Sequence, residues 1–265
     1  EEQDYVVKNE NGSFSITDSG KEFLNGAITN TDDNVYAFTG EKLTPITAAA
    51  AMARLSRRGD DMRVTILDEF AKNLGKDEGL LKRVITAYGD DSVQQLVGQH
   101  LVVEEASNLL TKKLEWGRLA SYLEQSTRYI YFDQKDKNGR YKYFTPPELD
   151  DLTKQVYEQT MDELFDNYSK LASELTDYVR NKSTVAESER DIAWKGATRA
   201  QACDAIRAVL PVATKSTVGI YASGQALESL IMHLQSDELA EARTTGDKIL
   251  AESRKVLPAF LERAD

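Results

Sequence analysis

The stretch Leu114-Glu-Trp-Gly-Arg-Leu-Ala-Ser-Tyr-Leu-Glu-Gln-Ser-Thr-Arg-Tyr-Ile-Tyr131 organises the rest of this chain. Its core, from Arg118 to Arg128, holds two arginines, two serines, a glutamate and a glutamine. An arginine fork together with serine hydroxyls satisfies several oxygens of a phosphate at once, whereas a lysine supplies only a point charge. The stretch therefore predicts an anion-binding turn. A plainer alternative is a polar helix end whose side chains cap backbone groups and pair on the surface.

The composition bounds the class of protein. The chain has 265 residues, of which 41% are hydrophobic, and this is ample for one large core or two modest ones. Its formal net charge of -11 argues against a nucleic acid or an anionic membrane surface as the main partner. Any phosphate must therefore be captured by local arginines, against the field of the whole molecule.

Cysteine and histidine are too scarce for several kinds of site. The single cysteine, Cys203, excludes an internal disulfide and fits a reducing compartment, so we expect a cytoplasmic protein. The two histidines, His100 and His233, have no second ligand at a suitable spacing, so no metal site is expected. No apolar run reaches the length of a membrane span, and the residues from Glu1 do not resemble a signal peptide.

The organisation along the chain is mainly helical. Residues 1–44 are polar with scattered apolar positions, which predicts an N-terminal arm with little core of its own. Pro45 opens a helix to residue 57, with Thr44 as its N-cap, and the remaining domain covers 45–265. Further helices are expected over 62–74, 80–88, 106–116, 192–209, 224–233 and 237–260.

The segment after the opening stretch predicts a hairpin and then a long helix. Aromatic residues alternate on both sides of Asn138-Gly139, which is typical of a β-hairpin over 129–144. Apolar residues at helical spacing predict one long helix over 148–180. With strand-like runs near residues 100, 130, 142 and 215, the pattern indicates a mixed α and β protein in which helices dominate.

The opening stretch also resembles a known family, the flavin-dependent thymidylate synthases or thymidylate synthase complementing proteins. Their motif is written Arg-His-Arg-x-x-Ser-x-Asn-Glu-x-Ser-x-Arg-Tyr, and the window from Trp116 to Tyr129 matches its second half closely. The turn Gly89-Asp-Asp-Ser92 resembles the family's Gly-His-x-Ser, in register without a gap, and Arg207-Ala-Val-Leu-Pro resembles its Arg-x-x-Leu-Pro. The resemblance implies an α/β fold in which a small, mostly antiparallel sheet is flanked by long helices.

The resemblance implies an activity and roles for individual residues. The family converts dUMP to dTMP with a methylene group from a folate and hydride from FAD, which NADPH has reduced. Such a mechanism needs no cysteine nucleophile, because the flavin carries the hard step. Family members are homotetramers with sites between subunits. Matching residues would hold dUMP (Glu124, Gln125, Ser126, Arg128 and Arg207) and FAD (Ser92, Arg118 and Glu124).

Several family positions are replaced here. Trp116 and Gly117 stand where the first Arg and the His occur, Asp90 replaces the flavin-side His, and Gln235 replaces an Arg at the pyrimidine. Loss of one such electrostatic donor costs roughly a hundred- to a thousandfold in rate. Two hypotheses follow: an active or altered flavin-dependent nucleotide methylase, or a non-catalytic member that keeps a nucleotide-phosphate pocket as a scaffold or partner domain. A plain helical structural protein is a third.

Overall fold

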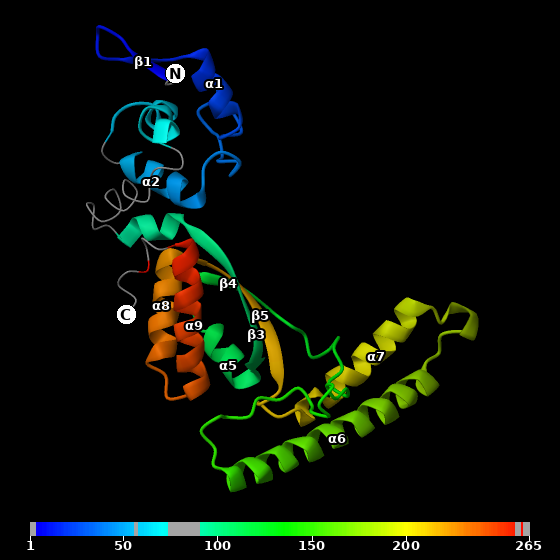
Figure 1. Ribbon diagram of the computed structural model, residues 1–265. Coiled ribbons are helices and arrows are strands. Elements are labelled where there is room, and N and C mark those ends of the chain that lie inside the picture. Colours follow the sequence, from blue (N-terminus) through cyan, green and yellow to red (C-terminus); the bar gives the residue numbers. More distant parts are fainter. Residues whose placement is uncertain (1–3, 56–57, 74–90, 258–260, 262–265) are drawn as a thin grey trace. The chain divides into compact units, whose positions relative to one another are not determined.

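The computed structural model describes residues 4–55, 58–73, 91–257 and 261 (Figure 1). The chain divides into two compact units. The first unit combines residues 1–99, 221–236 and 245–265, and the second combines 100–220 and 237–244. Each unit is described by itself below.

The first unit begins with a small antiparallel strand pair. β1 (Val6–Lys8) pairs with β2 (Phe14–Ile16), and α1 (Asp18–Asn25) follows. Thr17 caps α1, because its side chain accepts a hydrogen bond from the backbone of Gly20. A Cβ atom at Gly20 would collide with the carbonyl oxygen of Tyr5, so only glycine lets this helix approach the strand so closely.

The N-terminal residues have a core, which corrects the prediction of an arm with little core. The apolar residues that looked scattered in the sequence meet those of the following helices once α1 folds back over the strands. The sequence pattern missed this because few of them follow a single period. The cluster contains Val6, Phe23, Leu24, Ala27, Ile28, Leu43, Ala50, Ala51, Ile66, Leu67, Phe70 and Ala71.

The next helices of the first unit are close to those expected. α2 spans Pro45–Leu55, and the Thr47 amide donates to Thr44 Oγ1 at 3.1 Å, which confirms the predicted N-cap. The helix expected over 62–74 changes its winding: α3 (Met62–Thr65) passes into a π-helical turn, η1 (Ile66–Phe70).

The remaining described elements of the first unit are mainly helices. A short 3-10 segment, η2 (Ala71–Asn73), follows η1, and the helix expected over 80–88 lies outside the described residues. Later elements of this unit are η3 (Asp91–Leu96), α8 (Gly224–Gln235) and most of α9 (Ala240–Val256).

A three-stranded sheet carries the second unit. Its strands are β3 (Gly98–Ser107), β4 (Ala120–Glu124) and β5 (Lys215–Ser223), in the order β3-β5-β4. The Asn108 amide donates to Thr214 and the Leu109 amide to Val212, so β3 and β5 run antiparallel. The small antiparallel sheet is thus confirmed, with the runs near 100 and 215 as strands, whereas β4 was missed within the opening stretch.

The second unit also contains two long helices that pack on each other. After α5 (Asn108–Leu114), α6 (Asp151–Lys182) extends for 32 residues, or about 48 Å at 1.5 Å per residue. Asp150 caps it by accepting from the Thr153 amide at 2.9 Å. The chain then reverses, and α7 (Ile192–Ile206) returns beside α6 (Figure 1). The prediction of one long helix over 148–180 is confirmed with slightly shifted ends.

The predicted hairpin over 129–144 is wrong as a strand pair. The chain does turn near Gly139, whose φ is 76°, and the Asp136 amide donates to the carbonyl of Arg140 at 2.8 Å. However, no strand forms at 129–132, and Tyr143 makes only one isolated bridge, to Thr214.

The aromatic residues of this segment pack on α6 instead of on one another across a hairpin. The Tyr141 ring stacks on Phe165 at 5.1 Å, and its hydroxyl donates to Asp166 at 2.6 Å. Tyr143 also packs on Phe165, with ring centroids 5.8 Å apart. Tertiary packing therefore overrides the local strand propensity.

Candidate functional site

The predicted anion-binding segment starts at a tight turn between α5 and β4. The Tyr122 hydroxyl donates to the carbonyl oxygen of Gly117 at 2.8 Å, and a Cβ atom at Gly117 would lie 2.9 Å from that hydroxyl. A histidine at this position, as in the family motif, would require the Tyr122 side chain to move. The glycine at the position of the motif histidine thus leaves room for the Tyr122 hydroxyl. The neighbouring Trp116 side chain is 75% exposed.

Glu124, at the end of β4, is engaged in an ion pair. Lys112 Nζ lies 2.8 Å from Glu124 Oε2 and 3.3 Å from Glu115 Oε2. The hydrogen bond to Glu124 is the main reason why the pKa of Lys112 is raised above its ordinary value. A ligand that uses Glu124 must share this carboxylate with Lys112.

Gln125 and Ser126 connect the sheet to the turn. The Gln125 amide donates to the Thr217 carbonyl at 2.9 Å, so pairing with β5 continues for one residue beyond β4. Ser126 Oγ accepts from the Arg128 amide at 3.3 Å, and the Ser126 carbonyl accepts from the Tyr129 amide at 3.2 Å. These bonds fix the backbone of the turn that presents Arg128.

Arg118 and Arg128 are exposed and have no carboxylate partner among the residues that the structure describes. The Arg128 guanidinium lies 5.6 Å from the centroid of the Tyr129 ring, a cation–π contact that leaves its hydrogen-bond donors available. Two guanidinium groups on one short segment retain their capacity for an oxyanion.

Arg207 lies in η5 (Arg207–Val209), directly after α7. It forms an ion pair with Asp204 at 3.1 Å, and both side chains are about half exposed, at 49% and 50%. The exposed pair is weak, so a phosphate could displace Asp204 at small cost.

The other predicted positions lie in the first unit or outside the described residues. Ser92 belongs to η3, while Gly89 and Asp90 fall in the part of the chain that the structure does not describe. Gln235, at the family's arginine position, donates from Nε2 to Asp247 Oδ1 at 2.9 Å at the end of α8.

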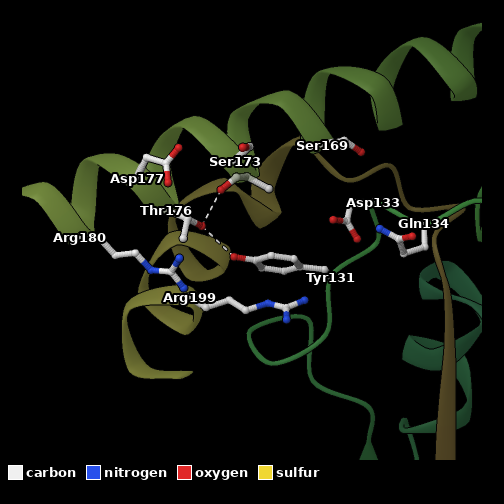
Figure 2. A pocket seen from close by; sticks show the side chains of 10 residues that line it. Tyr131, Asp133, Gln134, Ser169, Ser173, Thr176, Asp177, Arg180 and Arg199 are labelled. Atoms are coloured by element: carbon white, nitrogen blue, oxygen red, sulfur yellow. Dashed lines mark hydrogen bonds between the residues drawn. The ribbon is translucent and has the colours of Figure 1, made fainter. Parts of the chain in front are cut away.

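A cavity of about 590 Å³ lies in the second unit, between α6, α7 and the segment 131–134 (Figure 2). This volume is within the range of small-molecule sites. None of the predicted site residues lines it. Its walls are mainly polar: Tyr131, Asp133, Gln134, Ser169, Ala172, Ser173, Thr176, Asp177, Arg180 and Arg199.

Tyr131 is held in the cavity wall by α6 and α7. Its hydroxyl lies 2.8 Å from Thr176 Oγ1, which itself donates to the Ala172 carbonyl at 2.6 Å, so Tyr131 is the donor to Thr176 (Figure 2). Burial raises the pKa of Tyr131, and its phenol stays neutral. On the α7 side, the Arg199 guanidinium lies 3.5 Å from the centroid of the Tyr131 ring.

Sequence reasoning missed this cavity. Arg180 and Arg199 belong to no motif, since they come from two helices separated by a turn, and Tyr131 was assigned to a hairpin. The only signal was the row of small and polar residues on one face of α6, from Ser169 through Ser173 to Asp177, which is also typical of a solvated helix face.

A cysteine nucleophile or a metal centre is not supported among the described residues. Cys203 is buried on α7, and burial raises the pKa of its thiol, opposite to the shift of a reactive cysteine. No group of His, Cys, Asp and Glu suited to a metal ion is found in the described parts of the chain. Among the same residues, no helix is both long and apolar enough to cross a membrane.

Comparisons with known proteins agree with the fold. The family model of the thymidylate synthase complementing protein matches residues 40–259. A UPF0159 protein of Chlamydia pneumoniae is 35% identical over 263 residues, which cover 92% of this chain and 49% of the relative. A flavin-dependent thymidylate synthase of Clostridium tetani is 26% identical over 72% of this chain and 73% of its own length. The chain spans about half the length of the UPF0159 relatives it matches.

Solved structures share the fold at low sequence identity. The flavin-dependent thymidylate synthase ThyX of Helicobacter pylori, solved with FAD and dUMP, is 14% identical with a TM-score of 0.54 and covers 83% of this chain and 95% of its own. A UMP/dUMP methylase, PolB of Streptomyces cacaoi, is 17% identical with a TM-score of 0.50 and covers 83% of this chain and 90% of its own. Because the family model matches 40–259, the chain belongs to the thymidylate synthase complementing protein family.

Proposed function

We propose that this chain binds dUMP and FAD and takes part in the methylation of dUMP to dTMP, with methylenetetrahydrofolate as the carbon donor and NADPH as the reductant. The observation that carries the proposal is the pair of exposed guanidinium groups of Arg118 and Arg128, which have no carboxylate partner among the described residues, on the segment that matches the family motif. The match of the family model over 40–259 supports the same activity.

The residues of the second unit fit a nucleotide phosphate. Arg128 would pair with the phosphate beside Ser126, whose hydroxyl oxygen already accepts from the Arg128 amide and whose hydroxyl hydrogen remains to be donated. Glu124 and Gln125 would accept and donate hydrogen bonds at the nucleotide. Arg207 would release Asp204 and pair with the phosphate.

The fit to FAD rests on fewer residues. The unpaired guanidinium of Arg118 suits the flavin diphosphate, with Ser92 as a further contact and Glu124 between the two ligands. When bound, FAD would supply the hydride, and the protein would orient the nucleotide and exclude water. Because the resembled family has its sites between subunits, we propose that an oligomer, a tetramer as in the family, completes the site.

A non-catalytic partner domain is the second candidate. Gly117 leaves no place for the motif histidine without moving Tyr122, and Gln235 is bonded to Asp247 where the family has an arginine. Both departures weaken catalysis more than phosphate binding. This candidate keeps dUMP binding and lacks turnover.

Flavin absorbance of the purified chain tests the proposal. We expect a bound flavin whose spectrum shifts on addition of dUMP, together with dUMP-dependent oxidation of NADPH. A colourless protein that binds dUMP but does not oxidise NADPH supports the partner domain. A protein that binds neither FAD nor dUMP overturns both candidates.

A further inference from the structure

We propose that the cavity between α6 and α7 is a second ligand site, which binds a small phosphate monoester whose opposite end donates N–H hydrogen bonds. The site lies outside the motif segment, from Trp116 to Tyr129. Its ligand would be a further one, beyond those of the proposed methylation. The proposal rests on the cavity's shape and on four charged side chains that form no ion pair with a described residue.

The charged groups of the cavity are not neutralised by the protein. Neither Arg180 nor Arg199 forms an ion pair with a described residue, and the same is true of Asp133 and Asp177. Arg199 and Asp177 are exposed and Arg180 and Asp133 are half-buried, so their charged groups are accessible from the solvent. A ligand with complementary groups would pair with them.

The arginines are already oriented for an oxyanion. Arg180 donates from Nε to Thr198 Oγ1 at 3.3 Å, and Thr198 is only 6% exposed, so this bond anchors the base of the guanidinium. The Arg199 guanidinium is held against the Tyr131 ring. The terminal nitrogens of both groups have no hydrogen-bond partner among the described residues. A guanidinium fork matches two oxygens of a phosphate, whereas a lysine supplies only a point charge.

The opposite end of the cavity has acceptor chemistry. Figure 2 shows Asp133 and Gln134 on the far side of Tyr131 from Arg180. A carboxylate accepts from amide or amino groups, and the Gln134 amide can accept or donate. The two ends therefore call for different groups on the same ligand.

The wall formed by α6 sets the length of the ligand. Ser169 and Arg180 both line the cavity and are eleven residues apart, which is about 16 Å along a helix. Between them, Ala172, Ser173 and Thr176 present only small side chains. A nucleoside monophosphate with an amino group on its base, rather than inorganic phosphate alone, fills such a length.

Calorimetric titration of the full chain with AMP, ribose 5-phosphate and inorganic phosphate tests the proposal. AMP carries both a phosphate and an amino group, while ribose 5-phosphate lacks the donor at the far end. We expect AMP to bind about ten- to a hundredfold more tightly than either shorter probe, as for a hydrogen bond to a charged group.

Matched variants locate the site. Arg180→Gln should weaken AMP and ribose 5-phosphate alike, about ten- to a hundredfold, whereas Asp133→Asn should weaken AMP and leave ribose 5-phosphate unchanged. Lys170→Gln, an exposed charge on α6 outside the cavity, is the control for charge, and Arg128→Gln is the control for the motif segment. Circular dichroism of each variant checks folding.

Three outcomes overturn the proposal. The first is AMP binding no tighter than inorganic phosphate, and the second is AMP binding that Arg128→Gln abolishes and Arg180→Gln does not. The third is tighter binding of glutarate than of inorganic phosphate, which would show that the site prefers a carboxylate to a phosphate. Because none of these tests uses FAD or dUMP, their failure leaves the proposed methylation untouched.

Discussion

Arg128 stands on an exposed turn after β4, within a recognisable family motif, whereas Arg180 lines a cavity between two helices and belongs to no motif. The backbone bonds of Ser126 fix the first arginine locally. A contact to Thr198, eighteen residues away on another helix, fixes the second. A motif can therefore be recognised in the sequence, because residues close together in the chain position its side chains. A cavity between two helices depends on how the helices pair, and the sequence pattern hardly indicates this.

Removal of the cavity's supporting core should have the largest effect. Phe165 is fully buried on α6 against the rings of Tyr141 and Tyr143. Phe165→Ala should lower the free energy of unfolding by about 3–5 kcal/mol, as for other buried phenylalanines, in a urea titration. Leu152→Ala, on the same helix but 72% exposed, is the matched control and should change it by less than about 0.5 kcal/mol. Equal losses in the two variants would contradict the assigned core.

Loss of the motif arginine should affect a ligand more than the fold. Arg128→Gln should weaken dUMP binding about ten- to a hundredfold in a calorimetric titration, since it removes the proposed charge-assisted contact to the phosphate. Its stability should hardly change, because the side chain is exposed. Arg140→Gln, with a side chain 60% exposed, is the control. Unchanged dUMP affinity in the Arg128 variant would remove this arginine from the site.

The turn before β4 should depend on one hydroxyl. Tyr122→Phe deletes the hydrogen bond to the Gly117 carbonyl and should destabilise the protein by about 1 kcal/mol. Tyr178→Phe, on α6 with a side chain more than half exposed, should be neutral. Thermal unfolding measures both, and a neutral Tyr122 variant would show that the turn is held by its backbone alone.

The smallest expected effect concerns the ion pair between Lys112 and Glu124. The pKa of Lys112 is raised by Glu124, so the stabilisation is complete below the ordinary lysine pKa and is lost as the pH rises through the raised value. Because the lysine side chain is 64% exposed, we expect the ion pair to stabilise the protein by only about 0–1 kcal/mol. The stability difference between wild type and Lys112→Gln should therefore shrink at alkaline pH. A difference that grows with pH would contradict the pairing.

Much of the helical fold was predictable because its signals are local. The cap at Thr44 and the long apolar periodicity of α6 gave elements close to those observed. The strands were harder. β4 is stabilised by pairing with β5, about ninety residues later. The aromatic run after β4 packs on Phe165 and does not form the predicted strand pair.

The site divides in the same way. The roles of the residues from Arg118 to Arg128 in ligand binding stay a prediction. The motif could indicate the turn that presents Arg128, because the contacts of this turn lie within a few positions. It could not reveal that Lys112 holds Glu124 or that Asp204 pairs with Arg207, since partners of surface charges depend on side-chain conformations. The cavity needed α6 and α7 side by side.

One buried contact links the motif to the far end of the chain. The carboxylate of Glu241 accepts from the Ser107 amide at 2.9 Å and from its hydroxyl at 2.6 Å, while Ser107 caps α5 by accepting from the Leu110 amide. On the ribosome, the amide and hydroxyl of Ser107 gain this carboxylate partner only after Glu241 has been synthesised and has emerged from the exit tunnel. The contacts of the residue that caps the helix before the predicted anion-binding segment are therefore completed late in translation, and a nascent chain stalled before α9 would carry the motif without this contact.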